Sequence, residues 1–375
     1  MKFETMNLNS TILSGIKSMG YETLTPIQEK TIPIALDNYD VLGLAQTGTG
    51  KTAAFLLPIL QRLTMGSLGS VRSLILAPTR ELAEQIHQTV IDLGSKSNIR
   101  SIALYGGVNK FPQVKALKRG VDIIVACPGR LIDHLRDGNI NLSKVEILVL
   151  DEADTMCDMG FLPSIRRILR YLPKERQTLF FAATMPKEIR ILADDILNNP
   201  TSVQIGIIAP ADTVSHSIYP ITDALKKGLL MNLLKHTALG RVLIFTRTKH
   251  RAKQLTADLN EAGYRVAELQ GNLSQNRRQE AINGFRNGKY DLLVATDVAS
   301  RGIDVSDISY VINFDMPLTV DAYIHRIGRT GRAENTGEAI SLMSSEDLYL
   351  VRKIEKVLGK PIERFRSPDF EYGKF

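Results

Sequence analysis

The sequence predicts an α/β fold of two tandem domains, each built on a mostly parallel sheet that helices cover on both faces. Short apolar runs alternate with longer segments of helical periodicity along the chain, which is typical of βαβ units. This alternation is interrupted near residues 206–214, where Pro210 and small residues follow one another without a helical pattern. A length of 375 residues is enough for two such cores.

The strands are expected where apolar runs end in turn signals or in candidate helices. We place domains at residues 1–205 and 215–375, joined by a linker at 206–214. The first domain should contain strands at 40–44, 73–77, 101–105, 122–126, 146–150 and 178–182, and the second at 242–246, 265–269, 291–296, 310–315 and 339–343.

Composition excludes several classes of protein. With 44% hydrophobic and 23% charged residues, the chain is neither disordered nor collagen-like. No apolar stretch approaches the roughly 18 residues of a membrane helix, and Cys127 and Cys157 form no disulfide framework or zinc motif. The net charge, 47 − 40 = +7, favours a polyanionic partner without requiring one. We expect a cytoplasmic monomer with no membrane association.

A glycine-rich segment between an apolar strand and a helix-prone run has the context of a phosphate-binding loop. Its backbone N–H groups would surround the phosphates of ATP, Lys51 would neutralise phosphate charge, and the Thr52 hydroxyl would bind Mg²⁺. The alternative is a glycine-rich turn that binds no ligand. Ala45 stands where the simplest phosphate-loop pattern has glycine. The candidate residues are Ala45, Gln46, Thr47, Gly48, Thr49, Gly50, Lys51 and Thr52.

Acidic residues follow the strand expected at 146–150. Carboxylates at the C-terminal end of a parallel strand point into the crevice where such sheets bind ligands. Asp151 suits a partner of Mg²⁺, partly through water, and Glu152 suits the residue that orients and deprotonates an attacking water. The alternative is a solvated helix start, because acids favour helix N-termini.

Together, AQTGTGKT at 45–52, PTREL at 78–82 and DEAD at 151–154 resemble the DEAD-box ATP-dependent RNA helicases of superfamily 2. Segments 158–161 and 245–250 look most like the bacterial RhlE-type group. Phe3, Gly20-Tyr21 and the run TPIQ at 25–28 resemble the Q motif of the family. The resemblance implies two RecA-like domains with ATP and RNA in the cleft between them, and it implies that Gln28 reads adenine while Tyr21 packs on the base.

The second half of the chain resembles the family at residues 325–332, HRIGRTGR. By this resemblance Arg329 and Arg332 are arginine fingers that stabilise charge on the γ-phosphate, which completes a catalytic set with Lys51, Asp151 and Glu152. His325 suits a coupling role or, equally, a structural one. Asp304 resembles the residue that meets the ATP ribose.

Several loops at expected strand ends combine hydroxyl, glycine and arginine residues, which bind phosphates and sugars without reading bases. By the same resemblance they form a track for single-stranded RNA or short duplexes, with little sequence preference and a steep salt dependence. Aromatic content of 6% without tryptophan makes base stacking a minor force. The candidates are Pro78, Thr79, Arg80, Gly107, Pro128, Gly129, Arg130, Thr246, Arg247, Gly271, Thr296, Asp297, Arg301 and Gly302.

The chain departs from the family pattern at Ala182-Ala183-Thr184, where Ser-Ala-Thr is usual. We expect Asp154 and Thr184 still to couple hydrolysis to closure, with weaker coupling to strand separation because one hydroxyl is lost. Cys127, Gln270 and Leu24 are smaller departures.

The resemblance implies an RNA-stimulated ATP hydrolase that opens short duplexes or remodels ribonucleoproteins. We expect roles in ribosome biogenesis or RNA turnover, with ribosomal or degradosome-type protein partners. Two alternatives remain: an RNA-binding clamp with weakly coupled ATPase, and a DNA-translocating ATPase of the same superfamily.

Overall fold

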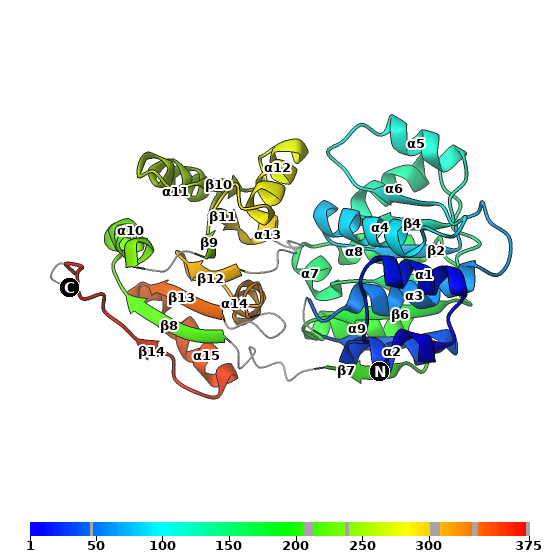
Figure 1. The fold of residues 1–375 in the computed structure, drawn as a ribbon, viewed down its shortest axis with the longest axis horizontal. Coiled ribbons are helices and arrows are strands. Elements are labelled where there is room, and N and C mark those ends of the chain that lie inside the picture. The colour runs from blue at the N-terminus through cyan, green and yellow to red at the C-terminus, as the bar shows by residue number, and fades with distance from the viewer. Residues whose placement is uncertain (46–47, 206–213, 237–239, 301–307, 332–336, 373–375) are drawn as a thin grey trace. The chain divides into compact units, whose positions relative to one another are not determined.

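The computed structural model describes the chain except residues 46–47, 206–213, 237–239, 301–307, 332–336 and 373–375. It divides into two compact units, Met1–Gly206 and Ile207–Phe375, each built on one sheet (Figure 1). Val214, which the sequence placed in the linker, is the first residue of a strand. No helix within the described ranges is long and apolar enough to cross a membrane.

The first unit alternates strands and helices. Its strands are β1 (Val41–Leu44), β2 (Ser73–Leu76), β3 (Ser101–Leu104), β4 (Ile123–Ala126), β5 (Ile147–Leu150), β6 (Gln177–Ala182) and β7 (Thr201–Gln204). Its helices are η1 (Phe3–Met6), α1 (Ser10–Ser18), α2 (Pro26–Leu36), α3 (Lys51–Leu63), α4 (Arg80–Leu93), α5 (Phe111–Lys118), α6 (Pro128–Arg136), α7 (Ala153–Asp158), α8 (Leu162–Leu169) and α9 (Lys187–Ile196).

The second unit follows the same plan. Its strands are β8 (Val214–Pro220), β9 (Arg241–Thr246), β10 (Val266–Leu269), β11 (Leu292–Thr296), β12 (Ile308–Asn313), β13 (Gly337–Met343) and β14 (Glu363–Arg364). Its helices are η2 (Asp223–Leu225), α10 (Lys226–His236), α11 (Lys249–Glu261), α12 (Gln275–Arg286), α13 (Asp297–Ser300), α14 (Val320–Ile327), η3 (Ser345–Asp347) and α15 (Leu348–Leu358).

The two sheets have equivalent topology. The first has the order β3-β4-β2-β5-β6-β1-β7, and the second has β10-β11-β9-β12-β13-β8-β14, which is the same order when the strands of each unit are counted from its first. The neighbouring strands are parallel in every described pair of both sheets. The expected doubly covered parallel sheets are therefore confirmed.

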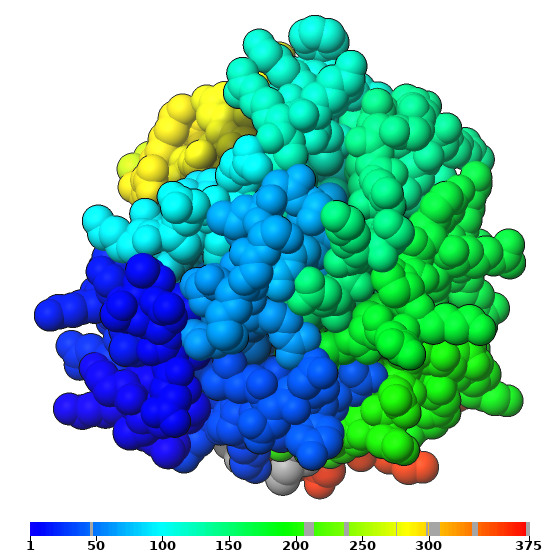
Figure 2. All heavy atoms as spheres, turned by 90° about the vertical axis from the view of Figure 1, so that its right-hand side faces the viewer, coloured from blue at the N-terminus to red at the C-terminus, as the bar shows by residue number. Residues whose placement is uncertain are grey.

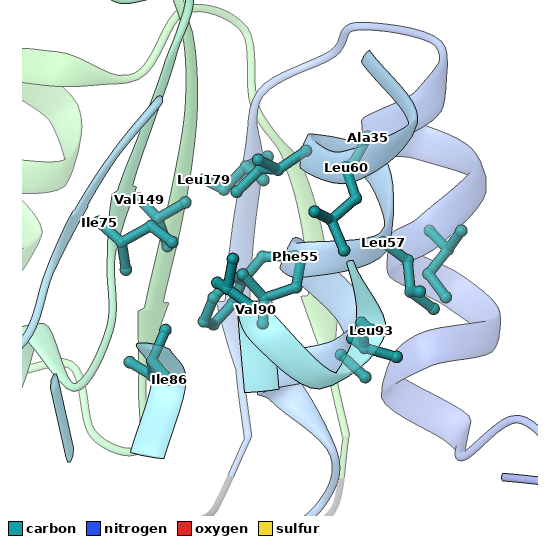
Figure 3. Packing of buried hydrophobic residues seen from close by; sticks show 14 of the residues in the cluster. Ala35, Phe55, Leu57, Leu60, Ile75, Ile86, Val90, Leu93, Val149 and Leu179 are labelled. Atoms are coloured by element: carbon teal, nitrogen blue, oxygen red, sulfur yellow. The ribbon is translucent and has the colours of Figure 1, made fainter. Parts of the chain in front are cut away.

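Helices bury both faces of the first sheet, which explains why its central strands β2, β4 and β5 are apolar at nearly every position. Helices α1 to α4 pack on one face, where Phe55, Leu60 and Val90 belong to the same hydrophobic core as Ile75 and Leu179 (Figure 3). Helices α6 to α9 cover the other face with the alternate residues of the same strands.

Three strands lie outside the sequence prediction: β7, β8 and β14. Strands β7 and β14 form sheet edges, where one side lacks a partner strand and the apolar signal weakens, whereas β8 lies between β13 and β14 and mixes buried with exposed residues. Strand β7 buries only Val203 of its four residues, and both residues of β14 are exposed. Periodicity alone therefore could not identify these elements.

Helices α1 and α4 of the first unit are in close contact. Gly15 of α1 lies against the C-terminal end of α4, and a Cβ atom there would stand 2.1 Å from the carbonyl oxygen of Leu93. Because the obstacle is backbone at a helix end, it has little room to move.

We therefore expect Gly15→Ala to lower the free energy of unfolding by about 1–3 kcal/mol, as overpacking does. Urea denaturation of the full chain measures the loss. Ser14→Ala is the matched control, because Ser14 is exposed on the same helix and alanine favours helices. Equal stability of the two variants would contradict this account of the contact.

Candidate nucleotide and RNA sites

The phosphate loop runs from β1 into α3, as the sequence predicts. Gly48 and Gly50 have φ angles of +85° and +93°, which side chains rarely adopt. The Lys51 ammonium is buried and donates to the Ala45 carbonyl at 2.7 Å, so it lies across the mouth of its own loop. Thr52 is half-buried on the first turn of α3. Gln46 and Thr47 lie outside the described residues.

Gln28 is bonded directly to this loop. Its amide NH₂ donates to the Gly50 carbonyl at 3.1 Å, and its amide oxygen accepts the Thr25 N–H at 3.0 Å. An amide carries two donors and two lone pairs, so each half keeps capacity for one more partner, such as an adenine edge. Tyr21 stacks on buried Phe3 with ring centroids 6.3 Å apart and keeps 37% of its surface exposed.

The acids after β5 are buried where the sheet ends. Burial raises the pKa of Asp151 to about 6, although the nearby Lys51 ammonium opposes the rise. The Glu152 N–H donates to the Asp151 carboxylate at 3.0 Å, and Glu152 itself has φ +50°, a strained conformation for a residue with a side chain. Strain held at a buried acid beside a phosphate loop is typical of functional sites.

Asp154 joins the ends of two strands. Its carboxylate accepts the backbone N–H groups of Ala183 and Thr184, at 3.0 and 2.8 Å, and the Thr184 hydroxyl at 3.1 Å. Next to this link, the Ala182 carbonyl accepts the N–H of Ala45, at the start of the phosphate loop, at 3.1 Å. Asp154 and Thr184, which the sequence predicts to act in coupling, are therefore in direct contact, and this contact exists without a hydroxyl at position 182.

These residues fit ATP with magnesium. Lys51 is buried beside the loop, and a divalent cation would stabilise the carboxylate of Asp151, whose pKa burial raises. Mg²⁺ takes few protein ligands and keeps water and phosphate oxygens as the others. In the part of the chain that the structure describes, no three His, Cys, Asp or Glu side chains form a metal cluster.

Three RNA-track loops of the first unit meet at the carboxyl ends of β2, β4 and β3. The Arg80 guanidinium lies over Gly107, where a Cβ atom would stand 2.0 Å from its nitrogen. Arg130 donates to the Val108 carbonyl at 3.1 Å and to the Gln113 amide oxygen at 3.0 Å. Both arginines thus pack around one glycine loop. Thr79 caps α4 by accepting the Leu82 N–H; Pro78 and Pro128 are buried, and Gly129 is exposed.

A buried histidine shares a hydrogen-bond partner with Arg130. Burial, reinforced by Lys110 and Arg130, lowers the pKa of His134 to about 4, so its ring is neutral at physiological pH. In that state Nε2 donates to the Gln113 oxygen, 3.0 Å away, and Nδ1 accepts from Asn139 at 3.4 Å. Gln113 therefore holds Arg130 and His134 with one oxygen atom, a role that the sequence did not reveal.

In the second unit, the loop after β9 is anchored by a buried acid. Asp315 accepts the Arg247 N–H at 2.9 Å and pairs with Arg251 at 3.1 Å. Thr246 is buried, and Thr248 caps α11 as Thr79 caps α4, at the equivalent position of the repeated topology. The Arg247 side chain remains half-exposed, with Asp347 3.6 Å away.

Arg326 of α14 is the centre of a buried network. Only 2% exposed, it forms a bidentate pair with Asp297 at 2.5 and 2.8 Å. It also donates to the Asn313 amide oxygen and to the Asp315 carbonyl, and it lies 4.8 Å from the centroid of the Phe245 ring. Asp297, predicted to contact RNA, therefore uses both carboxylate oxygens to hold Arg326.

The remaining predicted residues take simpler places. Arg329 is buried just after α14, His325 is half-buried on that helix, Thr296 ends β11 half-buried, and Gly271 is exposed after β10. Arg301, Gly302, Asp304 and Arg332 lie outside the described residues.

Comparison with known proteins agrees with this geometry. Residues 25–192 match the model of the DEAD/DEAH box helicase family, and residues 225–334 match the helicase conserved C-terminal domain. The chain belongs to the DEAD-box family of ATP-dependent RNA helicases. The family expected from the motifs is thus confirmed, whereas the RhlE-type subgroup stays a prediction.

The relatives of this DEAD-box protein span bacteria and yeast. The RNA helicase CshA of Geobacillus kaustophilus is 40% identical over 98% of this chain and 79% of its own. The yeast rRNA helicase RRP3 is 43% identical over 96% of this chain and 73% of its own. Among solved structures, S. cerevisiae Dbp5 bound to RNA and ADP BeF3 superposes with a TM-score of 0.88 at 32% identity, covering 98% and 96% of the two chains.

Arg326 was missed as an anchor, although the sequence carries a signal for it. Tyr323, Ile324 and Ile327 mark the buried face of α14, and position 326 lies three residues after Tyr323 on that face. An arginine on a buried face needs a carboxylate, and Asp297 follows an apolar strand.

We expect Arg326→Leu to lower the free energy of unfolding by about 3–5 kcal/mol, because it leaves the Asp297 carboxylate partly buried without its cation. Urea denaturation measures the change, and Arg326→Lys should recover part of it. Arg352→Leu, on exposed α15 surface, is the control and should cost little. A stability equal to the control would contradict the network.

Proposed function

We propose that the chain hydrolyses ATP in response to RNA and uses the cycle to open short duplexes locally and non-processively, or to remodel ribonucleoproteins. The observation that carries this proposal is the buried acid pair Asp151-Glu152 beside Lys51 at the phosphate loop. Related structures support it, since Dbp5 was solved with RNA and ADP BeF3 and Mss116p with single-stranded RNA and AMP-PNP.

In this proposal the nucleotide is held by groups from both units. Gln28 and Tyr21 bind the adenine, residues 45–52 bind the phosphates, and Asp304 binds the ribose. Mg²⁺ would be held by Thr52 and, partly through water, by Asp151, and it would neutralise charge on the β- and γ-phosphates.

Glu152 performs the proton chemistry. It orients a water in line with the γ-phosphate and accepts its proton while the water oxygen bonds to phosphorus and the bond to ADP breaks. Lys51, Arg329 and Arg332 stabilise the charge that spreads over the transferring group. ADP and inorganic phosphate are the products.

Coupling follows from shared ligands. ATP and RNA each draw groups from both units, so each favours the closed arrangement and tightens binding of the other. Asp154, Thr184 and His325 would transmit the state of the nucleotide. Arginines at the strand ends hold the RNA backbone, so affinity falls steeply with salt.

We place this activity in ribosome biogenesis or RNA turnover, with ribosomal or degradosome-type protein partners. The name of the relative RRP3, an rRNA helicase, supports the first of these. The chain would act as a cytoplasmic monomer.

A clamp that binds RNA without productive hydrolysis is disfavoured by the intact Lys51 and acid pair. Phosphate release measured with and without RNA separates the two proposals. Stimulation by DNA at matched salt, equal to that by RNA, would instead favour a DNA-translocating ATPase.

Glu152→Gln should lower the rate of ATP turnover by about a hundredfold or more, because an amide cannot accept the proton of the attacking water. ATP and RNA binding, measured by fluorescence, should persist, since the shape of the side chain is kept. Glu175→Gln, an exposed acid of the same unit, is the control. Turnover at the wild-type rate would overturn the site assignment.

Ala182→Ser should increase the number of duplexes separated per ATP hydrolysed. Residue 182 bonds the start of the phosphate loop and adjoins the two N–H groups that Asp154 accepts, so a hydroxyl there can strengthen the link between them. Ala183→Ser adds the same hydroxyl one residue away as a control. An unchanged ratio would show that position 182 does not limit coupling.

A further inference from the structure

Helix α5 presents an unusual exposed face beside the RNA-track loops. Phe111, at its first position, is 72% exposed. Lys115 and Lys118 are exposed at i+4 and i+7 from it, which places all three on one side of the helix. The opposite side buries Gln113 and packs Ala116 and Leu117 against the core.

The segment that contains this face carries only positive charge. Residues 106–121 include Lys110, Lys115, Lys118 and Arg119 and contain no acidic residue. Lys110 pairs with Asp137 at 2.6 Å, while the other three cations are exposed. A large exposed aromatic side chain among lysines matches the combination that single-stranded nucleic acids require, a stacking surface with phosphate-binding cations.

The sheet order places this face at the end of the track. Strands β2, β4 and β3 are neighbours in that order, and β3 is the edge strand. Their carboxyl ends are followed by Arg80, Arg130 and Gly107, and α5 begins at Phe111, four residues after Gly107. A strand of RNA that follows the three loops to the edge of the sheet meets α5 next. Figures 1 and 2 show α5 projecting at the top of the first unit.

The start of the helix is held firmly, which favours a preformed contact. The Phe111 N–H donates to the Asn109 side chain at 2.9 Å. Gln113, two residues on, donates to the Tyr105 carbonyl and accepts from Arg130. The residue that anchors α5 therefore also holds the arginine of the neighbouring RNA loop.

We propose that α5 extends the RNA track beyond the sheet edge: Phe111 stacks on an unpaired base, and Lys115 and Lys118 contact the adjoining phosphates. This inference rests on the proposed RNA function and adds to it an aromatic contact on single-stranded RNA. Such a contact favours a single strand over a duplex, because paired bases do not expose their faces.

The first experiment measures binding of labelled oligouridylate to the full chain by fluorescence anisotropy. Phe111→Ala should weaken binding by about five- to a hundredfold, the range for loss of one stacked base, and Phe111→Tyr should restore it. The loss should vanish with an oligonucleotide whose bases are replaced by abasic sites. Tyr171→Ala is the control, because Tyr171 is exposed between α8 and β6, at the amino ends of the strands.

Salt separates the two kinds of contact. The Phe111→Ala loss should be similar at low and high salt because stacking releases no counterions. A Lys115→Glu, Lys118→Glu double variant should flatten the dependence of log Kd on log salt, since it removes phosphate contacts. A Lys144→Glu, Lys174→Glu double variant, at exposed positions shortly before β5 and β6, is the charge-matched control and should leave the slope unchanged.

A spectroscopic test uses the absence of tryptophan from the chain. Phe111→Trp creates a sole tryptophan whose fluorescence should be quenched when RNA stacks on it, whereas Tyr171→Trp should not respond.

If Phe111→Ala binds RNA like wild type while Arg80→Ala and Arg130→Ala bind weakly, the α5 contact is wrong and the RNA function stands. If the arginine variants also bind like wild type, the RNA track itself fails.

Discussion

The parallel arrangement of the strands is the constraint on which the sites depend. In a parallel sheet the carboxyl ends of all strands lie on the same side of the sheet, and the helices that follow begin there with their N-termini. Loops far apart in sequence therefore converge: Asp154 and Thr184 touch across 30 positions because β5 and β6 are neighbours. The repeated strand order brings the same convergence to the second unit, where Asp315 and Arg247 meet across 68.

The charged groups at these strand ends are buried, and a buried charge needs a hydrogen-bonding or ionic partner. Asp154 is satisfied largely by backbone N–H groups, and Arg326 by a bidentate carboxylate, two carbonyl-type oxygens and an aromatic ring. Partners of this kind fix a side chain in one geometry. Each of these buried groups is thus held in place by several partners.

Much of the fold and of the nucleotide site could be predicted because local rules determine them. Buried parallel strands are apolar throughout, and a phosphate loop needs glycines with positive φ next to a helix start, so β1 and residues 48–52 are visible in one short stretch of sequence. Edge strands such as β7 lack that pattern. Gln113 and Arg326 act through contacts 17 and 29 positions away, and only the tertiary structure brings those partners together.

The link between Asp154 and the end of β6 is made mostly by main-chain groups. Two of its three contacts there are donated by the backbone, which every residue type except proline supplies. These hydrogen bonds therefore do not use the side chains at 182 and 183, whereas Thr184 also contributes its own hydroxyl. A junction held by main-chain N–H groups is therefore compatible with a residue that has no hydroxyl at position 182, as the alanine there shows.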